Sequence, residues 1–99
     1  MIQIYESGAA FLAENQTFLD TNPQISAFMV LDAPLLTETG KINYAAKCEK
    51  DGKTLLAMKV EPYHLQLFGD ADCAGELLDF LMRGGYEIQN YLCEKTLGD

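Results

Sequence analysis

The side chains with the greatest capacity for chemistry in this chain are three cysteines, Cys48, Cys73 and Cys93, and one histidine, His64. Thiolates and imidazoles bind zinc when they recur at short spacings such as C-x-x-C, and paired cysteines form disulfides in small secreted domains. Here the cysteines are widely spaced and the histidine has no second histidine near it. The spacing therefore predicts no metal site and no disulfide framework, and we interpret the cysteines as reduced.

Two of the cysteines have different expected roles. Cys48 falls on the apolar face of a predicted strand, where we expect it to pack as a small hydrophobic residue. Cys73 stands at the start of a predicted helix, where the positive end of the helix dipole lowers the pKa of a thiol. A reactive thiol at Cys73 is therefore the alternative to plain packing.

Aromatic and imidazole side chains on the predicted strands supply the candidate substrate-binding residues, Tyr44, Tyr63 and His64. His64 has Glu61 nearby as a carboxylate partner, and an imidazole works as a general base near neutral pH. Plainer interpretations stay open, because strand tyrosines commonly pack on a sheet with the hydroxyl in water and a lone strand histidine commonly lies at the surface. The pattern predicts no catalytic residue.

The short motifs that bind phosphate or activate a nucleophile do not occur in the sequence. It lacks G-x-x-x-x-G-K-[ST], G-x-G-x-x-G, H-E-x-x-H and G-x-S-x-G, so phosphate cradles, zinc hydrolysis and nucleophile-elbow chemistry have no basis in it. We therefore expect no cofactor-binding residue in this chain.

The N-terminal part of the chain predicts a short strand followed by a helix. Residues 1–5 alternate weakly, and Ser7 is a good N-cap for a helix over residues 8–20. One side of that helix carries its large apolar residues, which are Phe11, Leu12, Phe18 and Leu19. We expect this side to face the core.

A second helix is predicted over residues 23–31, because Asn22 caps well and Pro23 is preferred at the first helical position. Its apolar stripe comprises Ile25, Phe28 and Met29, and further apolar side chains at Val30 and Leu31 lie off the stripe. A helix that is apolar nearly all round is buried on more than one side or has a partner. We therefore expect a contact with another lobe or with a second copy through Phe28, Met29 and Val30.

Two alternating segments around Asp51 and Gly52 predict a β-hairpin, with strands from Lys41 onward and over residues 54–61. A two-residue loop would pair Tyr44 with Lys59 and would mix apolar and polar residues on both faces. A three-residue loop over residues 50–52 keeps one face apolar through the pairs Tyr44–Met58, Ile42–Val60 and Ala46–Leu56. The pattern therefore predicts the three-residue loop, with Gly52 at positive φ.

The remaining elements complete an α+β domain. A third strand is expected after Pro62, through Tyr63 and closing at Gly69, and then a helix capped by Asp70 or Asp72 and ended by glycines 84 and 85. Residues 86–92 are expected to form a last strand. The predicted order is β-α-α-β-β-β-α-β, an antiparallel meander with helices packed on it, as one domain over residues 1–99.

Charge and hydropathy narrow the class of protein. Fifteen acidic against seven basic residues give a net charge of -8, which repels phosphate backbones and argues against nucleic-acid binding. The charge fits a basic partner or a cationic substrate, and simple solubility is the alternative. The longest apolar stretch, over residues 25–36, is interrupted and too short for a membrane span, and no signal peptide is evident. We therefore expect a cytoplasmic protein.

The element order resembles the N-terminal portion of the GNAT superfamily of acetyl-CoA-dependent N-acetyltransferases. The similar segments are FLAENQTFLDTNPQISAFMVL for the paired helices, NYAAKCEKDGKTLLAMKVEPYHLQLFG for the meander, and ELLDFLMRGGYEI for the helix that ends in two glycines. Together they cover nearly the whole chain.

The family's mark is a Q/R-x-x-G-x-G/A turn at a helix N-terminus, which holds the pyrophosphate of the cofactor, and this chain lacks it. Its one basic residue before a glycine pair, Arg83, stands at the end of a predicted helix, where the dipole has the wrong sign for phosphate. The resemblance implies the substrate-side N-terminal lobe of an N-acetyltransferase, inactive alone, with acetyl-CoA bound only by a longer parent through its C-terminal lobe. The alternative is a stand-alone protein-interaction or dimerisation module with an acidic surface.

Overall fold

The computed structural model describes residues 1–61 and 63–88, and it confirms the predicted α+β class. In chain order the elements are β1 (Ile2–Ile4), α1 (Gly8–Leu19), α2 (Pro23–Asp32), the 3-10 turn η1 (Ala33–Leu35), β2 (Tyr44–Lys50), β3 (Lys53–Lys59), β4 (Gln66–Gly69), the 3-10 turn η2 (Ala71–Cys73) and α3 (Ala74–Arg83). Residues 86–88 are not a strand, and the rest of the expected last strand lies outside the described residues.

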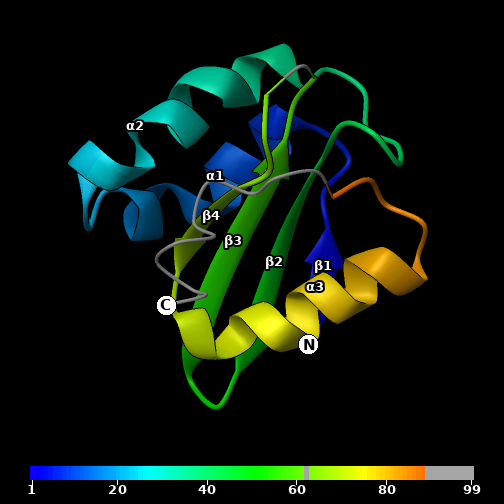
Figure 1. Ribbon diagram of the computed structural model, residues 1–99. Coiled ribbons are helices and arrows are strands. Elements are labelled where there is room, and N and C mark those ends of the chain that lie inside the picture. The colour runs from blue at the N-terminus through cyan, green and yellow to red at the C-terminus, as the bar shows by residue number, and fades with distance from the viewer. Residues whose placement is uncertain (62, 89–99) are drawn as a thin grey trace.

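The strands form one antiparallel sheet in the order β1-β2-β3-β4, so each strand pairs with its neighbour in the sequence. In Figure 1, α3 crosses in front of this sheet, whereas α1 lies behind it and α2 lies at the upper left. Two separate clusters of buried side chains lie between these layers, one on each face of the sheet. The sheet is therefore buried on both faces.

Helix α1 begins where the sequence predicts. Ser7 has extended backbone, and its Oγ accepts a hydrogen bond of 3.1 Å from the Ala10 N–H. Gly8 then lies close to the turn η1, because its N–H donates to the Leu36 carbonyl at 2.7 Å. A Cβ on Gly8 would lie 1.8 Å from the Ala33 oxygen, so only glycine permits this close approach.

Helix α2 also begins at the predicted residue, Pro23, but its buried side differs from the predicted stripe. Its buried residues are Ser26 and Met29, and the Ser26 Oγ donates to the Leu19 carbonyl of α1 at 2.8 Å. Ile25 and Phe28 are exposed. Ser26 thus faces the end of α1, and Met29 is the apolar residue that α2 places in the core.

The predicted three-residue hairpin loop is wrong. Tyr44 pairs with Lys59 and Lys50 with Lys53, which leaves Asp51 and Gly52 as a two-residue loop. Both loop residues have positive φ, 52° and 78° respectively, as a type I′ turn requires. Positive φ at Gly52 was therefore predicted correctly from a wrong register.

The register prediction failed because it assumed that only one face of the sheet is buried. Tyr44, Ala46 and Cys48 face the cluster that includes α3, whereas Leu56, Met58 and Val60 face the cluster that includes α1 and α2. The two apolar sets lie on opposite faces, so an even-length loop satisfies both.

The third strand is shorter than predicted, since β4 begins at Gln66, and Tyr63 and His64 lie in the loop before it. The end of the last helix agrees with the prediction, but its expected cap does not, because Asp70 caps the turn η2 and the N-cap of α3 is Cys73, which makes no side-chain cap hydrogen bond. Asp70 Oδ1 accepts from the Asp72 N–H at 2.9 Å in η2, and α3 ends at Arg83 before two glycines. The second of these, Gly85, has a φ of 78°, which terminates the helix.

Candidate functional site

Tyr44, the first candidate substrate-binding residue, is 0% exposed. Its ring contacts Tyr86 edge to face with 5.0 Å between centroids, and its hydroxyl donates to the Glu87 carbonyl at 2.8 Å. Burial raises the pKa of the Tyr44 hydroxyl well above its ordinary value, with the charge of Glu87 acting in the same direction. In this structure the side chain packs beneath the segment that follows α3.

Tyr63 and His64, the other two candidates, are exposed in the loop that joins β3 to β4. The Tyr63 N–H donates to the Val60 carbonyl at 2.8 Å, so the loop turns tightly as it leaves β3. Glu61, expected near His64, instead forms an ion pair with Lys59 at 3.2 Å. The structure thus brings Tyr63 and His64 together at the surface, and Tyr44 lies in the core.

Lys59 is a buried cation that sequence reasoning missed. It is 1% exposed, and its ammonium lies 3.2 Å from a carboxylate oxygen of Glu61 and 3.8 Å from one of Glu87. Its register position opposite Tyr44 directs it to the face covered by α3. The two-residue hairpin loop would have predicted the burial of Lys59, since that loop pairs Lys59 with Tyr44.

A second polar cluster lies where α1 crosses β1 and β2. Lys47 Nζ donates to Glu14 Oε2 at 2.7 Å, the Tyr5 hydroxyl donates to the same oxygen, and Asn15 Nδ2 donates to the tyrosine hydroxyl at 3.0 Å. The hydrogen bonds from Lys47 and then from Tyr5 lower the pKa of the Glu14 carboxyl. Burial, followed by the bond to Glu14, raises the pKa of the Tyr5 hydroxyl.

This second cluster has the geometry of a structural tie rather than of a reactive centre. The carboxylate of Glu14 accepts from Gln3 in β1, from Tyr5 just after β1 and from Lys47 in β2, which fixes α1 on these strands. The lowered pKa of the Glu14 carboxyl keeps it ionised at neutral pH, and the raised pKa of the Tyr5 hydroxyl keeps it protonated. Neither group is prepared for proton transfer there.

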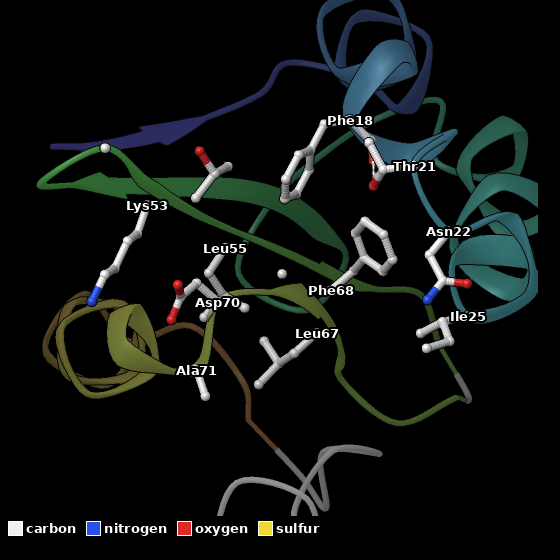
Figure 2. A pocket seen from close by; sticks show the side chains of 13 residues that line it. Phe18, Thr21, Asn22, Ile25, Lys53, Leu55, Leu67, Phe68, Asp70 and Ala71 are labelled. Carbon is white, nitrogen blue, oxygen red and sulfur yellow. Dashed lines mark hydrogen bonds between the residues drawn. The ribbon is translucent and has the colours of Figure 1, made fainter.

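A hollow of about 660 Å³ opens between the corner that joins α1 to α2 and the ends of β3 and β4. Figure 2 shows Phe18, Asn22 and Ile25 on one side of it, and Asp70 and Lys53 on the other. Its floor is aromatic, because Phe18 and Phe68 meet edge to face with 5.4 Å between ring centroids. The hollow therefore offers apolar contacts with a polar rim.

The connection from β4 to α3 carries two carboxylates where a phosphate would need free amides. Asp70 occupies the Asp72 N–H, and Asp72 forms an ion pair with Lys53. The hydrogen bond to Lys53 lowers the pKa of the Asp72 carboxyl. An anionic ligand at this helix start would compete with Asp70 for the Asp72 amide and with the Asp72 carboxylate for Lys53.

The two described cysteines, Cys48 and Cys73, are both free and buried. The Cys48 thiol donates to a Glu76 oxygen at 3.4 Å, and burial, together with that carboxylate, raises its pKa to about 12. The expectation that Cys48 packs as a small hydrophobic residue is confirmed. Cys73 is 0% exposed within the same cluster, a position that shields its thiol from reagents.

Within residues 1–61 and 63–88 there is no group of three or more histidine, cysteine, aspartate or glutamate side chains that could hold a metal ion. None of the helices described in this part of the chain has the length and apolar character needed to cross a membrane. Comparison of the chain with protein-family models, with curated proteins and with solved structures finds no match in any of the three.

Proposed function

We propose that this chain is the substrate-side N-terminal lobe of a GNAT-like N-acetyltransferase, and that it neither binds acetyl-CoA nor catalyses transfer alone. The observation that carries the proposal is the element order. A strand and two helices lead into three antiparallel strands, and a helix follows β4 on the opposite face of the sheet. The resemblance noted in the sequence rests on the same order.

The start of α3 supports the second half of the proposal. In the superfamily, the turn at a helix N-terminus holds the cofactor's pyrophosphate through backbone amides. Here Asp70 accepts from the Asp72 N–H and Lys53 pairs with Asp72, so that one amide and the nearest lysine already have carboxylate partners. A parent enzyme would therefore supply its cofactor site through another lobe.

Charge and exposure support a role on the acceptor side. An amine acceptor is a cation at neutral pH, and the chain carries a net charge of -8. Tyr63 and His64 are exposed in one loop, and the exposed Glu61 precedes them. We assign amine contact to Tyr63 and His64, an aromatic wall and an imidazole respectively.

The acceptor role is tested by titrating the ¹⁵N-labelled chain with primary amines, namely spermidine, a lysine-containing peptide and an aminoglycoside, while recording amide resonances. We expect at least one of them to shift the Tyr63 and His64 resonances saturably, and Tyr63→Ala to weaken that response. Tetramethylammonium is the matched control for charge alone. Equal shifts with tetramethylammonium, or no shift in this loop with any amine, would refute the acceptor role.

A stand-alone interaction module is the second candidate function, because α2 exposes large apolar side chains. Of the three residues expected to form a dimer contact, Phe28 is exposed, Val30 is half-buried and Met29 is buried in the core. Only Phe28 therefore offers a full side chain to a partner. Sedimentation equilibrium of the chain and of Phe28→Gln distinguishes a dimer through this residue from a monomer.

A further inference from the structure

Four large apolar side chains stay exposed on α2 and the turn η1. Ile25 is 65% exposed, Phe28 66%, Leu31 69% and Leu35 61%. Successive members are three residues apart on α2, so Ile25, Phe28 and Leu31 lie along one side of the helix, and Leu35 follows in the next turn. We call these four residues the α2 face. Contiguous exposed apolar surface of this kind marks interaction sites.

Neither α1, α2 nor the turn η1 has a basic side chain. The first 40 residues, which include all of α1 and α2, contain five acidic residues and no lysine, arginine or histidine. Among the described residues, the carboxylates of Asp20 and Asp32 accept only from the amides of Gln16 and Gln66, at 2.9 and 2.7 Å, and neither has an ion pair. An amide donor leaves the negative charge in place.

One of these carboxylates, that of Asp32, lies beside the α2 face. Asp32 follows Phe28 by four residues and Ile25 by seven, and these spacings place all three on the same side of the helix. At the other end, Ile25 also lines the hollow beside Phe18 and Phe68 (Figure 2). The α2 face thus combines an apolar stripe, a negative charge along it and a recess at one end.

We propose that the α2 face docks an amphipathic helix of a partner protein whose apolar stripe is flanked by lysine or arginine. The ten residues of α2 span about 15 Å, a length that matches apolar anchors at i, i+3 or i+4 and i+7 of a docked helix. Cationic flanks complement Asp32 beside the face and the acidic first 40 residues, which include Asp20, and they speed association. The recess beside Ile25 takes one large apolar side chain. This inference deepens the interaction-module proposal and is independent of the acetyltransferase proposal.

Charge distinguishes this partner from the other occupants of an apolar face. A second copy of the chain would bring its own carboxylates against Asp20 and Asp32, and like charges in contact are destabilising. An anionic membrane surface meets the same repulsion. A cationic amphipathic helix alone satisfies both the apolar stripe and the uncompensated charge.

The test is fluorescence anisotropy with a synthetic amphipathic helical peptide that has a leucine stripe and lysine flanks, titrated with the full chain. A second peptide with the same stripe and glutamate flanks is the charge control. We expect saturable binding of the lysine peptide only. The double variant Phe28→Gln/Leu31→Gln should weaken it by about tenfold or more, because apolar anchors carry most of the affinity. Asp20→Asn/Asp32→Asn should weaken it and reduce its dependence on salt.

Met82→Gln is the matched control variant, since Met82 is 64% exposed on α3, on the opposite side of the sheet. Its affinity for the lysine peptide should equal that of the unmodified chain, and urea unfolding verifies that every variant is folded. Equal binding of the glutamate peptide, no binding of either peptide, or an equal loss in Met82→Gln would overturn the proposal. A dimer in sedimentation that Phe28→Gln/Leu31→Gln dissociates would replace the cationic partner by a second copy, and binding only to vesicles containing phosphatidylglycerol would replace it by a membrane.

Discussion

Replacing Gly8 by alanine should destabilise the fold far more than the same change at Gly75. A Cβ on Gly8 would lie 1.8 Å from the Ala33 carbonyl oxygen, whereas nothing lies within 4 Å of one on Gly75. The obstacle at Gly8 is backbone, so no rotamer change relieves it and α1 must move away from the turn η1. Gly75 lies inside helix α3, where alanine is the better helix former.

The magnitudes follow from these two contacts. Overpacking costs about 1–3 kcal/mol, and weakening the 2.7 Å hydrogen bond from Gly8 to Leu36 adds about 1 kcal/mol. Gly75→Ala should instead stabilise the chain by about 0.5–1 kcal/mol, because alanine loses less backbone entropy on folding. In a domain of this size each kcal/mol changes the melting temperature by about 4–8 °C.

Urea unfolding followed by far-ultraviolet circular dichroism measures both variants against the unmodified chain. We expect a lower midpoint for Gly8→Ala, a higher midpoint for Gly75→Ala, and unchanged slopes, since the surface exposed on unfolding stays the same. A Gly8→Ala variant as stable as the unmodified chain would refute the close approach of α1 to η1 on which the position of α2 depends.

Three further predictions concern the hairpin, the buried lysine and the polar cluster of α1. Gly52→Ala should cost about 1–2 kcal/mol because of its positive φ, whereas Asp51→Asn should be neutral or stabilising in a type I′ turn; equal melting temperatures for the two variants would contradict this turn. Lys59→Met should change stability by less than about 1.5 kcal/mol, because apolar volume replaces the ion pair and the carboxylate partners of Lys59 reach solvent. Lys59→Ala should lose about 2 kcal/mol or more, because it leaves a cavity. Urea midpoints of the two variants test this, and equal losses would refute it. Folding lowers the pKa of Glu14 from its ordinary 4.5, so the stabilisation of the fold by its ionised carboxylate is present above pH 4.5 and is lost as the pH falls through the folded value. The stability difference between the unmodified chain and Glu14→Gln should therefore shrink in acid. Urea midpoints that stay equally far apart at every pH would contradict the bond to Lys47.

Local signals in the sequence predicted the elements well. The cap at Ser7, the proline at Pro23 and the two glycines after Arg83 act within a few residues of where they stand, and the structure places the helix ends there. Alternation likewise predicted β2, β3 and β4, although β2 starts at Tyr44 rather than Lys41 and β4 starts at Gln66, and residues 86–88 of the expected last strand are not a strand. The α+β class followed from the order of these elements.

What the sequence did not reveal depends on contacts between distant segments. Tyr44 was expected to line a site, but α3 and the segment after it cover this face of the sheet. Because α3 covers this face, both faces of the sheet are buried. The hydrophobic pattern therefore fits the two-residue hairpin loop, and in that register Lys59 points into the core. Ser26 lies on the buried side of α2, where it donates a hydrogen bond to α1, and Phe28 is exposed. The apolar periodicity of the helix does not predict this hydrogen bond.

Our central proposal is that this chain is an acceptor-side lobe that does not itself bind acetyl-CoA. Isothermal titration calorimetry of the purified chain with acetyl-CoA tests it most directly. The carboxylates of Asp70 and Asp72 at that helix start, together with the net charge of -8, predict no saturable heat. Saturable binding of acetyl-CoA in the micromolar range would contradict the claim.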